Sequence, residues 1–338
     1  MKKARYVWID ITKFILSIVI LLYHYNLFKL SWSNKWLMQG GYLAVDCFFV
    51  ISGFFYMATV YSLEKDQIKI IPTFIRKVKG LYVYYFVALI VVCAFMHLKL
   101  EDKINSVEKY RGLLGEILLI QEWGIPFFEP MYNGPTWYVS AMLLCVLLLT
   151  ISFKIISKKI RIFFLLATVI GTCCVLMLFV GNLHVHGTSS FVPVGVVRGL
   201  AGMGSGCLVY ILSQRVQQKR NLFGYMLFMI LCIFICIVSK DSMFDFLMIP
   251  ASCGLVLFGA NGKTENGKLT YFSNILGKLS YVVYLNQGVV RYALDEWKGQ
   301  YTCLMYVFAC VLVAIVMVAL VEFCGTHIKS IVSKGLHL

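Results

Sequence analysis

Charge is scarce in this chain. Only 14% of its 338 residues are Asp, Glu, Lys or Arg, whereas 60% are hydrophobic and the mean hydropathy is +0.81. A soluble globular domain carries about 25% charged residues, so this composition excludes an ordinary soluble enzyme. Acidic residues are the scarcest: 16 stand against 31 Lys and Arg, a formal net charge of +15. The basic residues gather in short segments between apolar runs. We therefore attribute them to membrane orientation, or to a polyanionic cofactor at the inner surface, rather than to nucleic acid.

Other signals are also missing. The cysteines lack the paired spacing of zinc sites, and most lie within apolar runs, as Cys93 and Cys145 do. There they act as small packing residues, so we predict neither a metal site nor a disulfide framework. No small-residue cleavage site follows the first apolar stretch; Tyr23, His24 and Tyr25 follow it instead. We expect a retained first span rather than a signal peptide. Internal repeats and low-complexity tracts are absent from the sequence as well.

Apolar runs of membrane length are abundant. A helix needs about 20 apolar residues to cross the hydrocarbon core of a bilayer. We predict a single all-α, polytopic integral membrane domain over residues 1–338, with about ten transmembrane helices. The predicted spans are residues 9–28, 40–62, 80–98, 136–156, 161–180, 191–213, 223–239, 243–260, 275–294 and 301–325.

The loop charges predict how this domain is oriented. With the N-terminus inside, the predicted inner segments hold 20 of the 31 Lys and Arg residues, and the outer loops hold 8. Basic residues favour the cytoplasmic side of a membrane. The bias therefore predicts an even number of spans, with both termini in the cytoplasm.

One predicted loop is long. Residues 99–135 face outward on this count, and loops of such length are usually functional or disordered. The loop is rich in acids, and aromatic residues such as Trp137 lie near its end. Together they could stack on a sugar and hold its hydroxyls. The alternative is an aromatic belt at the level of the lipid headgroups. Residues 112–122 are predicted to form a short interfacial helix.

The first predicted span carries two ionisable residues on one face. Lys13 and His24 are eleven residues apart, which at about 100° per residue places them within roughly 20° of each other around a helix. Ionisable side chains inside a bilayer are costly and suggest function. We interpret Lys13 as a cation for a phosphate and His24 as a general base for a hydroxyl proton. Together they suggest a reaction path across the membrane. The simpler alternatives are an ion pair of Lys13 with Asp10 and a capped histidine at the interface.

Further charges lie inside other predicted spans. Asp46 falls within the second span, where a lone carboxylate needs a partner. It could orient His24, or it could pair with Arg198 or Arg291. Arg198 could hold Asp46 or stabilise developing negative charge. The glycines that follow it, in residues 199–206, favour close contact between helices.

Arg76, Lys77 and Lys79 come just before the third predicted span. They could hold phosphates together with Lys13. Snorkelling toward the headgroups explains them equally well.

In the ninth predicted span, Tyr284, Gln287 and Arg291 recur at i, i+3 and i+7 and share one helix face. They could line a polar cavity, or they could only hydrogen-bond to one another.

Several of these segments together resemble the membrane-bound acyltransferase family 3, whose members O-acylate cell-surface polysaccharides, lipopolysaccharide and peptidoglycan. Lys13 and His24 are similar to the basic-x10-His motif of that family, in which arginine is the commoner basic residue. The resemblance covers nearly the whole chain. Its other parts are the second-span signature at residues 41–54, the Trp-containing segment at 135–139, Arg198 with its glycines, and the late segment at 276–285.

The resemblance implies an acyl-CoA donor that enters from the cytoplasm and an acceptor hydroxyl on the outer side. It implies His24 as the catalytic residue, with Lys13 and Arg76 at the donor. We therefore expect an O-acyltransferase, most simply an O-acetyltransferase using acetyl-CoA, that modifies a surface or exported polysaccharide. Many family members place a histidine where this chain has Gln287.

The same resemblance sets the expected surroundings. We expect a multi-pass protein of the bacterial cytoplasmic membrane, with acyl-CoA, a glycan and the lipid bilayer as its partners. We expect no permanently bound cofactor and no fused extracytoplasmic domain, and a homodimer is compatible with the resemblance. Two other functions fit the intramembrane charges: a transporter or exporter of a glycan or metabolite, and a structural membrane subunit.

Overall fold

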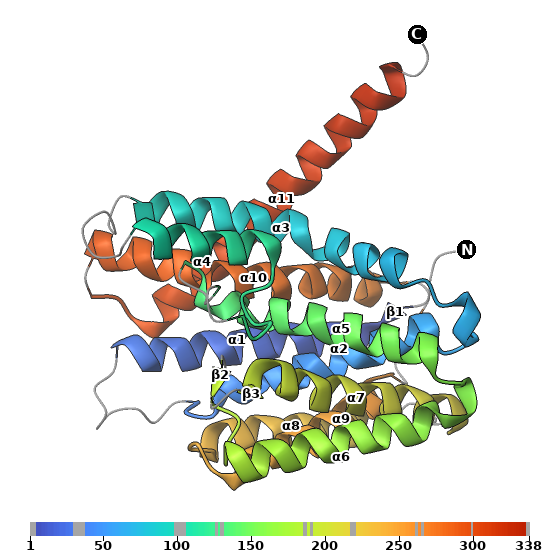
Figure 1. Ribbon diagram of the computed structural model, residues 1–338. Coiled ribbons are helices and arrows are strands. Elements are labelled where there is room, and N and C mark those ends of the chain that lie inside the picture. Colours follow the sequence, from blue (N-terminus) through green and yellow to red (C-terminus); the bar gives the residue numbers. More distant parts are fainter. Residues whose placement is uncertain are drawn as a thin grey trace.

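The computed structural model describes residues 5–29, 38–97, 106–125, 128, 132–184, 188–189, 192–216, 221–260, 263–264, 267–298 and 300–335. Most of these residues are helical (Figure 1). The α-helices are α1 (Val7–Lys29), α2 (Ala44–Val60), α3 (Ile70–His97), α4 (Ser106–Leu118), α5 (Trp137–Ile155), α6 (Arg161–Phe179), α7 (Val194–Arg215), α8 (Leu222–Val238), α9 (Met248–Ala260), α10 (Lys268–Lys298) and α11 (Cys303–Gly335). Two short antiparallel strand pairs join β1 (Arg5–Tyr6) to β4 (Lys263–Thr264) and β2 (Thr188–Ser189) to β3 (Val192–Pro193).

The predicted class, an all-α polytopic membrane protein, is confirmed. Within the described residues, eight helices are long and apolar enough to cross a membrane. The other two predicted spans are helical too: α8 is apolar but has 17 residues, and α10 is longer and more polar. The β1–β4 pair brings together the segments that precede α1 and α10. We call this end of the bundle the inner end and the opposite end the outer end. Its assignment to the cytoplasm stays a prediction from the loop charges.

Helix α3 begins earlier than the sequence predicts. The expected span covers residues 80–98, after a basic loop at 76–79, but the helix already begins at Ile70 and includes that loop. Apolar residues on one face of this first part, among them Phe74 and Val78, pack against the core. Basic side chains on the remaining faces leave this apolar contact intact, so the helix continues through them.

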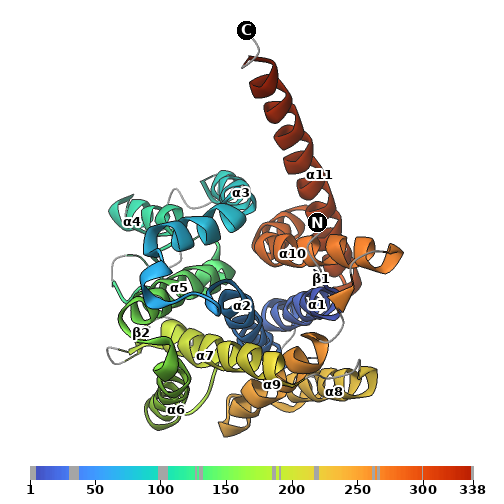
Figure 2. The same ribbon diagram turned by 90° about the vertical axis from the view of Figure 1, so that its right-hand side faces the viewer.

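Helices α2 and α7 form the centre of the bundle (Figure 2). In each of them, 78% of the spanning window is buried, against 11% in α6. Their backbones nearly touch: a Cβ atom on Gly53 would lie 2.0 Å from the carbonyl oxygen of Met203, and one on Gly206 would lie 1.9 Å from that of Val50. Only glycine permits such an approach. The close contact predicted from the glycine-rich stretch is confirmed.

The outermost helices expose their apolar side chains. Only 22% of the spanning window is buried in α3 and in α11, and Phe163 on α6 and Phe308 on α11 are among the large exposed hydrophobic residues. Exposed apolar belts of this kind suit contact with lipid tails. The last part of α11 leaves the bundle (Figure 1).

The predicted outer loop, residues 99–135, contains helix α4, which packs alongside α3 (Figures 1 and 2). The hydroxyls of Tyr82 and Tyr85 on α3 donate to carbonyl oxygens of Ile117 and Glu116 at 3.1 and 2.9 Å. The helix spans Ser106–Leu118 rather than 112–122. It lies against a transmembrane helix because its own apolar face needs cover.

Two acidic residues of this loop are buried in the protein. Glu116 is fully buried, and its carboxylate accepts the backbone N–H groups of Tyr132 and Asn133, each at 3.0 Å. Glu122 is 3% exposed. These two carboxylates are therefore turned into the protein. Other acids of the loop, among them Glu101 and Glu129, lie outside the described residues.

Replacing Gly206 by Ala should destabilise the protein, because the new methyl group collides with the backbone of α2. Overpacking of this kind typically costs about 1–3 kcal/mol, and more where a backbone must move. Thermal melting of the purified protein in detergent measures the effect as a lower Tm. The matched control is Gly171→Ala on α6, where a Cβ meets nothing within 4 Å. Alanine favours a helix over glycine, so the Tm of this control should not fall. Equal melting of the two variants would contradict the packing argument.

Candidate active site

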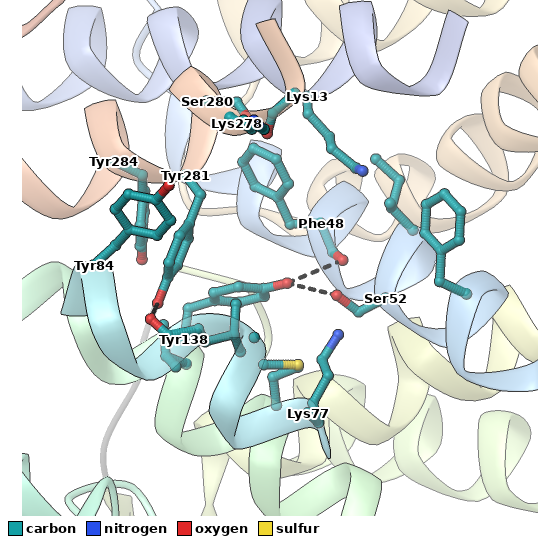
Figure 3. A pocket seen from close by; sticks show the side chains of 17 residues that line it. Lys13, Phe48, Ser52, Lys77, Tyr84, Tyr138, Lys278, Ser280, Tyr281 and Tyr284 are labelled. Carbon is teal, nitrogen blue, oxygen red and sulfur yellow. Dashed lines mark hydrogen bonds between the residues drawn. The ribbon is translucent and has the colours of Figure 1, made fainter. Parts of the chain in front are cut away.

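A cavity of 310 Å³ lies toward the inner end of the bundle (Figure 3). Three lysines line it from three helices: Lys13 on α1, Lys77 on α3 and Lys278 on α10. Of the other lining residues, six are aromatic: Phe48, Phe55, Tyr84, Tyr138, Tyr281 and Tyr284.

The cations of this inner cavity are held by different contacts. Lys13 Nζ lies 3.0 Å from Asp10 Oδ1 and 4.7 Å from the centre of the Phe55 ring. Lys278 forms an ion pair with Glu322 of α11. Lys13 and Lys77 are close enough for their charges to interact. Like charges gathered around an apolar wall create a field that attracts anions.

The floor of the inner cavity is fixed by Tyr138. Its hydroxyl lies 2.8 Å from Ser52 Oγ and donates to the carbonyl oxygen of Phe48 at 3.1 Å (Figure 3). These bonds join α5 to α2 beneath the cavity. The ring of Tyr138 therefore has a set position.

A second cavity, of 350 Å³, contains His24 and lies nearer the outer end. Its polar wall includes Arg198, Tyr42 and His184, and the His24 ring meets the ring of Tyr23 edge-on at 5.2 Å. His24 lies one turn from the end of the apolar span of α1, which ends at residue 27. An imidazole here faces a space large enough for part of a ligand.

Asp46 and Arg198 form a buried ion pair between α2 and α7. The Nε of Arg198 donates to Oδ1 at 3.2 Å and its Nη2 donates to Oδ2 at 2.7 Å, and both residues are 1% exposed. The guanidinium also lies over the ring of Trp137, 5.1 Å from its centre. Of the partners considered for Asp46, Arg198 is the one observed. Orientation of His24 by Asp46 stays a prediction.

Tyr284 is the one described residue that lines both cavities. Its hydroxyl donates to the carbonyl oxygen of Pro135, and its ring lies near those of Tyr138 and Phe48, with centres 6.0 and 6.4 Å away. The sequence suggests one reaction path along α1. The structure divides that path into two chambers that share Tyr284 as a wall.

A hydrogen-bonded network lines the outer part of the His24 cavity. Tyr23 Oη lies 2.7 Å from His184 Nε2, and Nδ1 of the same ring lies 3.0 Å from Asp241 Oδ1. The ring of Tyr42 lies against His184 at 4.7 Å, and its hydroxyl donates to the buried Asp245 at 2.8 Å. Loops from three parts of the chain are thus fixed around the cavity.

The comparison with known families agrees with this arrangement. A family model described as "Acyltransferase domain" matches residues 6–322, nearly the whole chain. The chain belongs to the membrane-bound acyltransferase family 3. Neither the curated proteins nor the solved structures contain a match to it.

Membership in acyltransferase family 3 makes the chain a membrane enzyme that transfers acyl groups other than aminoacyl groups. The resemblance inferred from the motifs is confirmed. The transporter, which suits the charges equally well, and the structural subunit gain no support from the family match.

Within this family 3 enzyme, the predicted donor residues separate into two groups. Lys13 and Lys77 line the inner cavity, whereas Arg76 and Lys79 are exposed on other faces of α3. Residues one and two positions apart point about 100° and 200° away from each other on a helix. The three basic residues of α3 therefore cannot all point into the same cavity.

The three α10 residues that were predicted to share one face also have different surroundings. Tyr284 lines both cavities, but Gln287 is 1% exposed and donates to the backbone carbonyl of Tyr284 at 2.9 Å. Arg291 lies 3.9 Å from Asp295 and over the ring of Tyr292. Gln287 and Arg291 are thus engaged within α10. A part for them in the reaction stays a prediction.

The wall residues absent from the predicted site include Lys278 and His184. Lys278 lies within the late family segment and shares a helix face with Tyr281, so the sequence pattern could have indicated it. His184 is one of two histidines in the segment after α6, the other being His186, and nothing in the neighbouring sequence distinguishes it. Its contacts with Tyr23 and Asp241 depend on tertiary structure alone.

Replacing Asp46 by Ala should strongly destabilise the enzyme, because it leaves the Arg198 cation buried without its counterion. Removing one partner of a buried pair typically costs about 3–5 kcal/mol. Melting in detergent provides the measurement. The control is Lys158→Ala, which removes an exposed pair with Glu64 at 3.7 Å. Pairs of that kind contribute about 0–1 kcal/mol. The pair would lose its assigned role if Asp46→Ala melted as the control does.

Proposed function

We propose that this enzyme transfers an acyl group, most simply acetyl, from cytoplasmic acyl-CoA to a hydroxyl group of a surface or exported polysaccharide. The observation that carries the proposal is the pair of cavities. One is lined by lysines, the other contains a histidine, and Tyr284 is common to both. A polyanionic donor and a neutral acceptor need this kind of separation.

The inner cavity suits the donor. Coenzyme A carries several phosphates, and lysine is a compact, mobile cation for phosphate groups. In the proposal, Lys13, Lys77 and Lys278 hold these phosphates. Arg76 and Lys79 add charge at the exposed side of α3. The pantetheine arm then extends along the aromatic wall toward Tyr284.

His24 supplies the base. It takes the proton of the acceptor hydroxyl as that oxygen bonds to the carbonyl carbon of the thioester. The carbon–sulfur bond breaks, and the departing CoA thiolate receives the proton from His24. A histidine has a pKa close to the operating pH, which suits both halves of this exchange.

Arg198 lies on the wall of the same cavity and can stabilise the oxyanion that develops on the carbonyl oxygen. A cation fixed before the reaction needs no rearrangement when charge appears. Asp46 and Trp137 hold this guanidinium from two sides. In this proposal Asp46 is a positioning residue that acts through Arg198.

Tyr284 must turn aside before the acyl group can reach His24. In this structure its hydroxyl donates to the Pro135 carbonyl, and its ring is part of the wall that the two cavities share. Once rotated, the same hydroxyl becomes a donor that faces the thioester. The proposed setting is the bacterial cytoplasmic membrane, with the inner end of the bundle in the cytoplasm and a homodimer permitted.

Replacing His24 by Ala should reduce acyl transfer by about 10²–10⁴-fold, the usual contribution of general base catalysis. The measurement is transfer of radiolabelled acetyl from acetyl-CoA to glycan extracted from cells that lack the protein. Mass analysis of the cell-surface glycan provides an independent reading. Unchanged protein level and Tm serve as the control for folding. Full acylation by this variant would refute the assignment.

Replacing Lys13 by Ala should raise the KM for acetyl-CoA about tenfold, because a hydrogen bond to a charged group contributes about 1.5–3 kcal/mol when well formed. Binding of CoA to the purified protein should weaken in parallel. The matched control is Lys159→Ala, an exposed lysine just before α6 that does not line the cavity. If both variants bind CoA equally well, the donor site lies elsewhere.

A further inference from the structure

A third cavity, of 330 Å³, continues outward from the His24 cavity, with which it shares Tyr23, Leu27 and His184. We call it the outer groove. Its remaining wall includes Asn26 and Asp241. At about 100° per residue, His24, Leu27, Tyr23 and Asn26 succeed one another around one side of α1. A ligand bound at His24 therefore has a direct route into the groove.

Asn26 is the unusual residue of this groove. It is 3% exposed, and neither its amide nitrogen nor its amide oxygen has a hydrogen-bond partner among the residues that the structure describes. Buried polar groups nearly always have partners, since an unmet donor or acceptor costs free energy. A side chain that lines a cavity and keeps both functions unmet is suited to an incoming ligand.

The part of the groove wall that contains His184 and Asp241 is already held in place by hydrogen bonds. His184 bonds to Tyr23 through one ring nitrogen and to Asp241 through the other, at 2.7 and 3.0 Å. The side chain of Asp241 is 52% exposed, so its carboxylate also reaches the surface. Lys240 adds one cation beside it. The charges of Asp241 and Lys240 balance, so the groove favours neither an anionic nor a cationic ligand.

We infer that the outer groove binds a neutral sugar unit of the acceptor glycan, adjacent to the unit whose hydroxyl reaches His24. This inference rests on the proposed function. Each sugar hydroxyl both donates and accepts a hydrogen bond, which matches the two unmet functions of the Asn26 amide. Leu27 and the ring of Tyr23 present an apolar surface to the C–H face of a sugar ring.

Replacing Asn26 by Leu tests the inference. With glycan extracted from cells that lack the protein as the probe, the KM for glycan should rise about tenfold. The kcat and the KM for acetyl-CoA should stay within twofold of the wild-type values. The Tm without glycan should equal or exceed that of the wild type, because the change removes a buried polar group without partners. The rise in Tm that glycan causes should shrink.

Asn274→Leu is the matched control, because this partly buried asparagine of α10 lines none of the cavities described. A wild-type KM for glycan in Asn26→Leu, or a lower Tm without glycan, overturns the inference. The fate of the proposed function is read separately, from His24→Ala. That variant should lose transfer yet keep the rise in Tm caused by glycan. If it keeps transfer instead, the assignment of His24 as the base fails while the proposed function stands. If the wild-type protein transfers no acetyl group to glycan, the proposed function fails, and the rise in Tm alone then decides the groove.

Discussion

The buried pair of Asp46 and Arg198 is the interaction on which the centre of this protein depends. Two opposite charges without contact to water hold each other only in close, well-aligned geometry. That geometry requires α2 and α7 to approach closely, and Gly53 and Gly206 make the approach sterically possible. Helices α1, α5, α6 and α9 pack directly against these two helices (Figure 2). The same guanidinium faces the His24 cavity, so structure and chemistry share one constraint.

The two sides of the active-site region differ in kind. The inner cavity combines lysines, whose side chains are long and flexible, with aromatic rings, which suits a long, polyanionic and flexible ligand. The outer cavity combines an imidazole with a guanidinium that is already fixed by hydrogen bonds and a stacked indole. In the proposed mechanism, the lysines serve binding, whereas the fixed guanidinium serves stabilisation of the transition state.

Much of the fold was predictable, because each span is an apolar run that must be helical in a bilayer. The early start of α3 was not, since a helix tolerates charges on faces that the packing leaves free. The position of Lys13 and His24 on one face followed from helix period alone. Their division between two cavities could not follow from it, because Tyr284 comes from α10, far along the chain. His184 was likewise hidden, since its partners meet it only in three dimensions.

The shared wall at Tyr284 also bears on the energetics of the cell. A continuous aqueous passage through a membrane enzyme would let protons and other ions cross and would dissipate the gradients that the bilayer maintains. Here one phenol ring, bonded to a backbone carbonyl, forms the wall that the two cavities share. In the proposed mechanism, a wall of this kind admits a single small substituent per turnover while the barrier to ions stays intact, and it protects the thioester from hydrolysis.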